Sequence, residues 1–454
     1  MKQRFAKQIL AASVAMLAAS GALATNGYYT HGLGVKNKGM AGAGTAMPQE
    51  AIAVSMNPAS SVLLGDRFEA GISIFSPRRS YEASASLANG QGGAFTIGAG
   101  EVTSGRKYFP IPYIARSWAI DDNEAWAVSL YGRGGMNTTF NGGSATLDPD
   151  GPGPFPVTTL PGAFGGGKMG VDLAQMFADF SYSVKQGRLA AGMSVVLAGQ
   201  RFSGSGFGNF AAFAESFAAS QGTVLPANLT NNGYDYSFGA GMKFGVIYEL
   251  TDKINLALSY QTRMKMKEFD KYSDLFAQNG GFDIPSSIRA GMSVKLTDRS
   301  SFHYDIEHTS FSEVDSVGNP VENIFSCPTV AGIDLSSCLG GNNGAGFGWD
   351  DMTTHKFGLQ WQPAGNGAWT YRVGYSRGSQ PIEKSQVLFN MAAPGVIEQH
   401  ITAGFTHRIS NGHEYSMNFM YAPEEKVSGT NPFDPTQTIE LKMHQFELEF
   451  GYSW

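Results

Sequence analysis

The chain has 454 residues and a formal net charge of −6, which argues against nucleic acid as a partner. Only 15% of its residues are charged, well under the roughly 25% of an average soluble protein. Aromatic residues make up 12% of the chain and glycines number 58, with no linker-like break in composition. Past the N-terminal region, no apolar run is long enough to cross a bilayer as a helix, so the mature chain is either soluble or a β-barrel. The composition favours the barrel.

Residues 1–24 are typical of a secretory signal peptide. A basic start precedes an apolar run at 9–19, and Ala22-Leu23-Ala24 forms an A-x-A cleavage site. The apolar run is shorter than the roughly 20 residues that a membrane-spanning helix needs. We therefore expect this segment to be removed on export.

The segment 32–59 differs from the rest of the chain. It is rich in Gly and Ala, keeps no lasting period of 2.0 or 3.6 residues, and ends in Asn57-Pro58-Ala59. Because the chain that follows has the pattern of a barrel, we expect residues 25–66 to form a plug inside it. Residues 67–454 are expected to form the barrel itself.

From residue 67 onward, runs of about ten residues alternate apolar and polar side chains. This period indicates strands with one face in lipid and the other in a polar lumen. Fourteen such runs are predicted, and a closed bacterial barrel needs an even number. They lie near 67–76, 111–120, 123–133, 174–184, 188–201, 234–249, 253–267, 284–296, 299–311, 351–362, 368–378, 397–409, 412–422 and 439–454.

The connections between these runs fall into two classes. Those after even-numbered strands are short and turn-like, such as Gln186-Gly187 and Thr251-Asp252. Those after odd-numbered strands are long, as at 134–173, 312–350 and 423–438. Outer-membrane barrels have short periplasmic turns and long extracellular loops. Both ends of the barrel are therefore expected on the periplasmic side, and the plug enters the lumen from there.

One of the long connections has a helical pattern. Phe207, Phe210, Phe213 and Phe217 recur every three or four residues, which predicts an aromatic stripe on one face of a helix. Such a stripe either packs against the scaffold or offers a surface on which an apolar substrate first binds.

The two cysteines, Cys327 and Cys338, lie in a polar, Gly-rich stretch of another long connection. Export to an oxidising compartment favours a local disulfide between them. A metal site is the alternative, but no histidine lies between or beside the pair. We expect no metal site.

The last predicted strand alternates Phe446, Phe450 and Trp454 with polar residues and ends on the aromatic side chain. This pattern resembles the C-terminal signal that the outer-membrane assembly machinery recognises. An ordinary amphipathic edge strand would explain the alternation but not the terminal tryptophan.

A search for catalytic motifs finds no G-x-S-x-G, H-E-x-x-H or Walker-type sequence, so we predict no enzyme and no cofactor. Three cations, Arg133, Lys356 and Arg372, fall on the polar side of their strands. Each is either paired with acids of the lumen or available to a carboxylate that moves through it.

The motifs Gly32-Leu33-Gly34, 39–46 (GMAGAGTA) and Asn57-Pro58-Ala59, followed by a fourteen-strand pattern, resemble the FadL family of outer-membrane transporters for long-chain fatty acids and other hydrophobic compounds. The resemblance covers the whole mature chain. It implies a monomeric fourteen-stranded barrel with an N-terminal hatch, in which Asn57, Pro58 and Ala59 match the family's hatch motif together with the glycines Gly39, Gly42 and Gly44.

The resemblance also implies a third strand that is kinked inward and leaves a gap for sideways exit, and helices in extracellular loops that form a greasy capture groove. Gly132, Gly134 and Gly135 at the end of the third predicted strand would permit such distortion. The chain departs from the family at 47–50, where Met-Pro-Gln-Glu retains one acid although many members carry several.

We therefore predict a bacterial outer-membrane channel for passive uptake of long-chain fatty acids or similar hydrophobic compounds, gated by the hatch. Its expected partners are an apolar small molecule, outer-membrane lipid and, during biogenesis, the assembly machinery. The alternative substrate is a monoaromatic hydrocarbon. A general porin would keep its lumen open, and a barrel enzyme would need a catalytic constellation that the sequence lacks.

Overall fold

The computed structural model describes residues 26–148, 156–328, 333–365, 367–409 and 412–454. The expected signal peptide at 1–24 lies outside these residues. Among the residues described, no helix is long and apolar enough to cross a membrane.

Fourteen antiparallel strands of the described residues close into a barrel, in which each strand pairs with its neighbours in the chain and β1 pairs with β19. All fourteen predicted strands are confirmed. They are β1 (Arg67–Ala83), β4 (Phe109–Ala119), β5 (Glu124–Asn137), β8 (Gly170–Gln186), β9 (Leu189–Ser205), β10 (Asp235–Glu249), β11 (Ile254–Gln261), β13 (Ser287–Thr297), β14 (Ser300–Thr309), β15 (Met352–Trp361), β16 (Trp369–Gly378), β17 (Gln399–Arg408), β18 (Glu414–Asn431) and β19 (Asp434–Ser453).

The alternation along each strand separates an outer apolar face from a polar lumen. On β19, Phe446 and Phe450 are exposed on the outside, whereas Glu447 and Glu449 are buried inside. Trp118, Trp361 and Trp369 lie next to the short turns, which is where an outer-membrane barrel places one of its aromatic girdles. The barrel therefore spans the outer membrane with its short turns on the periplasmic side.

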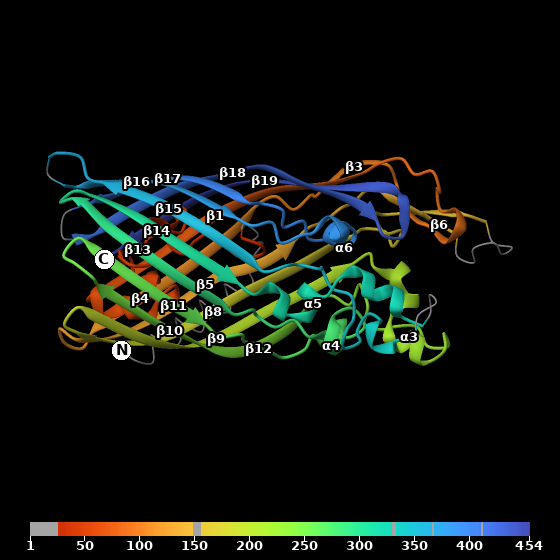
Figure 1. Cartoon of the computed structure of the whole chain (residues 1–454), viewed down its shortest axis with the longest axis horizontal. Coiled ribbons are helices and arrows are strands. Elements are labelled where there is room, and N and C mark those ends of the chain that lie inside the picture. Colours follow the sequence, from red (N-terminus) through yellow and green to blue (C-terminus); the bar gives the residue numbers. More distant parts are fainter. Residues whose placement is uncertain (1–25, 149–155, 329–332, 366, 410–411) are drawn as a thin grey trace.

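The two ends of the barrel differ as predicted (Figure 1). The short turns and the C-terminus lie at one end, and the long connections with their helices lie at the other. The elements of the long connections are η3 (Gln91–Gly93), β2 (Phe95–Ile97), β3 (Gly100–Thr103), β6 (Ser144–Leu147), β7 (Thr158–Pro161), η4 (Gly208–Phe213), α3 (Glu215–Ala219), β12 (Lys265–Met266), η5 (Asp270–Tyr272), α4 (Ala277–Gly280), η6 (Phe311–Glu313), α5 (Asp315–Gly318), η7 (Val321–Ser326), η8 (Leu335–Ser337), η9 (Lys384–Gln386) and α6 (Val387–Asn390).

One predicted loop is wrong. Residues 423–438 are not an irregular connection, because β18 continues to Asn431 and β19 begins at Asp434, so the two strands form a long hairpin that extends well past the predicted strand ends. On the outer face of this extension Lys426 contacts Glu440 and Lys442 contacts Glu82. These side chains are polar because the hairpin has left the membrane there, and so the apolar alternation is lost.

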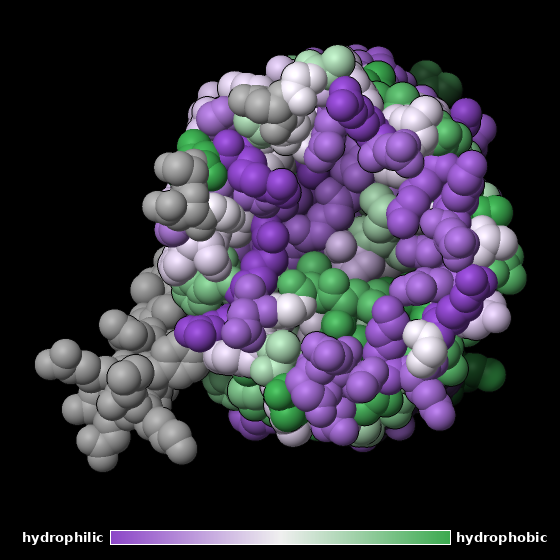
Figure 2. Space-filling view, turned by 90° about the vertical axis from the view of Figure 1, so that its left-hand side faces the viewer, coloured by the Kyte–Doolittle hydropathy of each residue, from purple (hydrophilic) through white to green (hydrophobic). Residues whose placement is uncertain are grey.

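The N-terminal segment lies inside the barrel as a plug, which we define as residues 26–66. It contains three short helices, α2 (Val35–Lys38), η1 (Ala51–Ser55) and η2 (Pro58–Leu63), and residues 26–46 are all buried. Figure 2 shows the barrel from its periplasmic end, where a hollow with a mainly hydrophilic rim leads inward.

Candidate functional site

A small apolar pocket lies among the long extracellular connections. Phe207 and Phe210 of the predicted stripe line it, beside side chains from β8, β9 and three other connections. Its lining residues are Val171, Phe202, Phe207, Phe210, Leu275, Phe276, Ser316, Leu339, Ala345, Gly346, Phe347 and Phe389. The pocket is suited to an apolar ligand that leaves water.

The stripe itself is not one helix. Ala214 has extended backbone angles and separates η4 from α3, so the four rings do not share a face. Phe213 packs against Phe433, with ring centroids 5.6 Å apart, and Phe217 lies against Gly222. Of the four candidates, Phe207 and Phe210 line the pocket.

Cys327 and Cys338 are joined by a disulfide in the connection that borders this pocket. The next residue, Leu339, lines the pocket and donates a backbone hydrogen bond to the carbonyl of Phe213, with an N···O distance of 2.8 Å. The disulfide thus holds this connection next to the aromatic helices.

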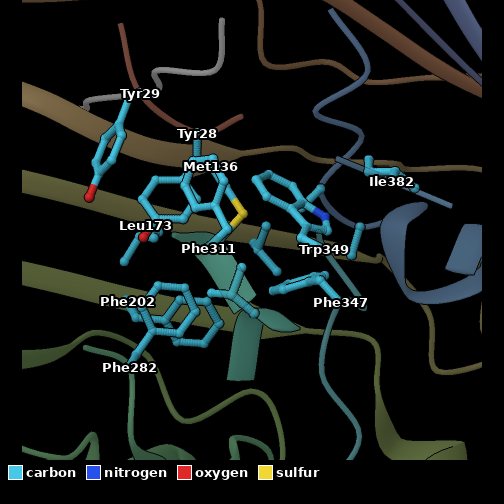
Figure 3. Packing of buried hydrophobic residues seen from close by; sticks show 14 of the residues in the cluster. Tyr28, Tyr29, Met136, Leu173, Phe202, Phe282, Phe311, Phe347, Trp349 and Ile382 are labelled. Atoms are coloured by element: carbon cyan, nitrogen blue, oxygen red, sulfur yellow. The ribbon is translucent and has the colours of Figure 1, made fainter. Parts of the chain in front are cut away.

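Aromatic rings connect the pocket to the plug (Figure 3). Phe347 lines the pocket and contacts Trp349, which lies 5.4 Å from Phe311 between ring centroids. The plug residue Tyr28 lies 5.1 Å from Phe311 and 5.8 Å from Trp349. A chain of contacting aromatic rings therefore runs from the pocket to the plug.

Backbone pairing in the barrel wall is interrupted between β4 and β5, and we call this interruption the window. Their pairing ends at Tyr113 and Tyr131, although β4 continues along β1 to Phe109 and β5 continues along β8 to Asn137. The two sides meet again where Gly105 donates a hydrogen bond to the carbonyl of Thr139, with an N···O distance of 2.8 Å. Between these points the described residues of β4 and β5 form no backbone hydrogen bonds with each other.

Local sequence explains the window. Pro110 and Pro112 lack the N–H groups that a central strand needs, so this part of β4 behaves as an edge. On β5 a bulge at Arg133 shifts the register between Gly132 and Gly134. The sequence analysis noted the glycines of β5 but not the two prolines of β4. Two prolines at alternate positions indicate a strand that is not fully paired on both sides.

The plug occupies the free edge of β5 in this window. Thr30 donates its backbone N–H to the carbonyl of Arg133, and Gly135 donates its own to the carbonyl of Tyr28, both with N···O distances of 3.0 Å. The residues between them, Tyr29 and Gly134, face each other as an antiparallel bridge. The plug therefore takes the place of the missing β4 partner.

The Asn57-Pro58-Ala59 motif docks on another part of the wall, at β9 and β10. The side chain of Asn57 accepts a hydrogen bond from the N–H of Ala59 and donates one to the carbonyl of Val246, at 3.0 and 3.1 Å. Wall glycines make room for it, because a Cβ on Gly245 would lie 1.9 Å from the Asn57 oxygen and one on Gly192 would lie 2.5 Å from Pro58.

The three candidate hatch glycines have different roles. Gly42 has a φ of +87°, and an added Cβ would lie 2.1 Å from the carbonyl oxygen of His31. Gly44 also has positive φ, and its N–H donates to Asp305 at 3.1 Å. Gly39 adopts right-handed helical angles at the end of α2.

Two of the three candidate cations share one acid. Arg133 contacts Glu307 at 2.9 Å and Lys356 contacts it at 2.6 Å, and Arg289 is a third partner at 2.8 Å. Lys356 also donates to the carbonyl of His31 in the plug. The three cations thus surround the carboxylate of Glu307.

Arg372 lies apart from this cluster. Its guanidinium donates to Gln49 of the plug and to Thr406, both at 2.8 Å. Sequence reasoning missed Glu307 and Asp305, because strand periodicity places an acid in the lumen without showing which cation or plug residue it meets.

Glu50, the one acid of the segment 47–50, binds the first turn of the plug helix α2. The carboxylate of Glu50 accepts hydrogen bonds from the N–H groups of Lys36 and Asn37 at 3.0 and 2.8 Å. Burial, together with the neighbouring Glu69, raises the pKa of Glu50 to about 8.

Comparison with known proteins identifies the family. The sequence profile described as "Outer membrane protein transport protein (OMPP1/FadL/TodX)" matches residues 166–445, which is more than half of the chain. The chain belongs to this family. A search of curated proteins finds no match.

Solved structures share the fold of this OMPP1/FadL/TodX family member at low sequence identity. The toluene transporter TodX of P. putida is 16% identical, with a TM-score of 0.62, and the match covers 93% of this chain and 98% of that one. A FadL homologue of Pseudomonas aeruginosa is 13% identical, with a TM-score of 0.61, and the match covers 94% of this chain and 98% of that one. The toluene transporter TbuX of Ralstonia pickettii is 14% identical, with a TM-score of 0.57, and the match covers 93% of this chain and 98% of that one. The protein is thus an outer-membrane transport barrel with the FadL-type architecture.

Proposed function

We propose that this family member is a channel for passive uptake of long-chain fatty acids or similar hydrophobic compounds, gated by its plug. The observation that carries the proposal is the window between β4 and β5, whose free strand edge is covered by residues 28–30 of the plug. An apolar compound that passes this point leaves sideways into the membrane without crossing the periplasmic end of the lumen.

The first step is binding in the extracellular pocket around Phe207 and Phe210. Removing apolar surface from water supplies roughly 25 cal/mol per Å², so no energy source is needed to concentrate the ligand there. The aromatic rings of Phe347 and Trp349 then lead toward the lumen.

The second step is release of the plug from β5. The pairing at the window consists of two backbone hydrogen bonds, each with a net stabilisation of about 1 kcal/mol, whereas ion pairs such as Lys38 with Glu447 hold the deeper plug. Residues 28–30 carry no charged side chain, so a local movement of this segment breaks no ion pair, although it separates the buried rings of Tyr28 and Tyr29 from Phe311.

A monoaromatic hydrocarbon is the second candidate substrate. It is favoured by the structural likeness to TodX and TbuX, which are described as toluene transporters. A general porin is disfavoured because the plug fills the lumen. For an enzyme we find no supporting motif.

Deleting the gene tests the proposal. We expect growth on oleate as sole carbon source at limiting concentration to be lost, and to return when the gene is restored. Uptake of labelled toluene by the same strains separates the two substrate classes. Unchanged uptake of both compounds, in a host without another family member, would refute the function.

A further inference from the structure

Arg79 of β1 is a buried cation without a counter-charge. Its side chain is on the lumen side of the strand, and the residue is 3% exposed. Nε and Nη2 have no hydrogen-bond partner among the described residues, and no described carboxylate lies within 4.0 Å of the guanidinium. Its one charge-related contact in this part of the chain is with the ring of Phe109, 5.9 Å from the ring centroid.

Most other buried cations of the lumen are paired with an acid, and Arg372, which is not, donates hydrogen bonds to Gln49 and Thr406. Arg133 contacts Glu307, Lys243 contacts Asp179 at 2.8 Å, and Lys38 contacts Glu449 at 3.0 Å. A guanidinium stays protonated under ordinary conditions, and burying a charge without a partner is costly. The lone charge of Arg79 therefore calls for an anion that the described chain does not supply.

The position of Arg79 relates this charge to the window. The Arg79 guanidinium lies over the ring of Phe109, the first residue of β4, at the window. Phe109 and Ile111, the next residue of β4 that faces the lumen, are both buried. Close by, Ser104 donates its N–H to the Arg79 carbonyl at 2.8 Å, in the segment that closes the window above. A single positive charge thus adjoins an apolar stretch that leads to the opening.

We propose that Arg79 binds the carboxylate of a long-chain monocarboxylic acid while the acyl tail lies along Phe109 and Ile111 toward the window. This inference rests on the proposed function and selects fatty acids over neutral hydrocarbons within it. Arg79 then determines specificity, because a toluene-like ligand leaves the guanidinium unpaired and a fatty acid does not.

The test is equilibrium binding by the purified full-length protein of two ligands with the same tail, oleate and oleyl alcohol. Arg79→Met keeps the length of the side chain and removes the charge, and Arg79→Gln is a second, polar variant. Arg79→Lys is the conservative variant. Arg78→Met is the matched control, because Arg78 is the neighbour in sequence but donates to the exposed Tyr108 hydroxyl at 2.8 Å.

We expect Arg79→Met and Arg79→Gln to weaken oleate binding about tenfold or more, as for loss of a charged hydrogen bond, and to leave oleyl alcohol binding unchanged. Arg79→Lys should recover part of the loss, and Arg78→Met should change neither ligand. Heat-modifiable migration on gels verifies that each variant is folded.

Three results would overturn the inference. The first is unchanged oleate binding in folded Arg79→Met or Arg79→Gln. The second is an equal loss of both ligands, which would make Arg79 structural. The third is displacement of oleate by acetate at equal concentration, which would make the site one for small anions. Failure of the wild-type protein to bind either ligand would instead refute the proposed function, and this inference with it.

Discussion

At the residue scale, the carboxylate of Glu307 holds three buried cations together. Replacing it by Gln removes the carboxylate that Arg133, Arg289 and Lys356 share, which should destabilise the folded barrel by about 3–5 kcal/mol. Unfolding in denaturant, followed by tryptophan fluorescence in detergent, measures the change.

The control for this variant is Glu249→Gln. Glu249 also forms an ion pair, with Lys185 at 3.1 Å, but both side chains are partly exposed at a periplasmic turn. Its loss should therefore cost less than about 1 kcal/mol. Equal effects of the two variants would contradict the view that Glu307 is the centre of a buried charge cluster.

Glu50 makes plug docking depend on pH. Its pKa is raised to about 8 in the docked plug, so the docked state binds the proton more tightly than a solvated one. The contribution of this proton to docking is complete below the ordinary value of 4.5 and is lost as the pH rises toward about 8. Docking of α2 should thus weaken between pH 5 and pH 8.

Hydrogen exchange of residues 35–38, corrected for the intrinsic effect of pH on exchange, measures this change. The wild-type protein should lose protection as the pH rises, and Glu50→Gln should show a flatter profile, because glutamine cannot titrate whereas Lys36, whose pKa burial lowers to about 8, still does. Protection that increases with pH would show that the sign is wrong.

At the element scale, the hatch motif depends on glycines of the wall. In Gly245→Ala the added methyl would stand 1.9 Å from the Asn57 oxygen, so η2 cannot keep its place against β10. We expect hydrogen exchange to accelerate about tenfold or more over residues 57–63, as for loss of one or two hydrogen bonds, while the barrel still assembles.

Gly199→Ala is the comparison, because the nearest atom to its added methyl would be an outward-facing ring atom of Phe238 at an ordinary 3.4 Å. This variant should leave exchange of the motif unchanged. If both variants behave alike, the motif is not positioned by the wall.

The elements could largely be predicted from sequence, because lipid imposes alternation on every strand. The predicted loop at 423–438 is wrong because the chain has left the lipid there, and alternation is no longer required. Outside the membrane, β18 and β19 carry residues such as Lys426 and Lys442 on their outer face, and polar strands look like a loop. The aromatic stripe divides at Ala214 because its rings pack in different directions, which their spacing does not reveal.

The candidate site was less predictable than the fold. The inward direction of Arg133 and Lys356 followed from alternation, but their shared partner Glu307 lies 174 and 49 residues away in sequence. Arg79 shows no signal at all in sequence, since an unpaired cation differs from a paired one only through its surroundings. Pairing across the barrel requires the register, which periodicity alone does not provide.

At the scale of the whole molecule, the central claim is that a ligand leaves only when the plug frees the window. Tyr29 and Gly134 face each other in the bridge that covers it. Non-hydrogen-bonded antiparallel pairs have Cα atoms about 4.5 Å apart, close enough for a disulfide. A Cβ on Gly134 would meet only the end of the flexible Gln175 side chain at close range.

The double variant Tyr29→Cys/Gly134→Cys can thus lock the plug to β5 on oxidation. Ser181→Cys/Ser194→Cys is the matched control, because those hydroxyls lie 2.7 Å apart on β8 and β9, so their disulfide links two wall strands to each other and not the plug to the wall. The native cysteines Cys327 and Cys338 are already bonded to each other. Treating the parent protein with reductant measures the effect of opening this native disulfide alone.

The decisive measurement is the initial rate of labelled oleate uptake by cells that carry each variant, before and after reduction. The account predicts that the oxidised plug lock takes up oleate no faster than cells without the protein, that reduction restores uptake, and that the wall cross-link has no effect. Equal uptake by the oxidised and reduced plug lock, with the cross-link verified by mass spectrometry, would contradict it.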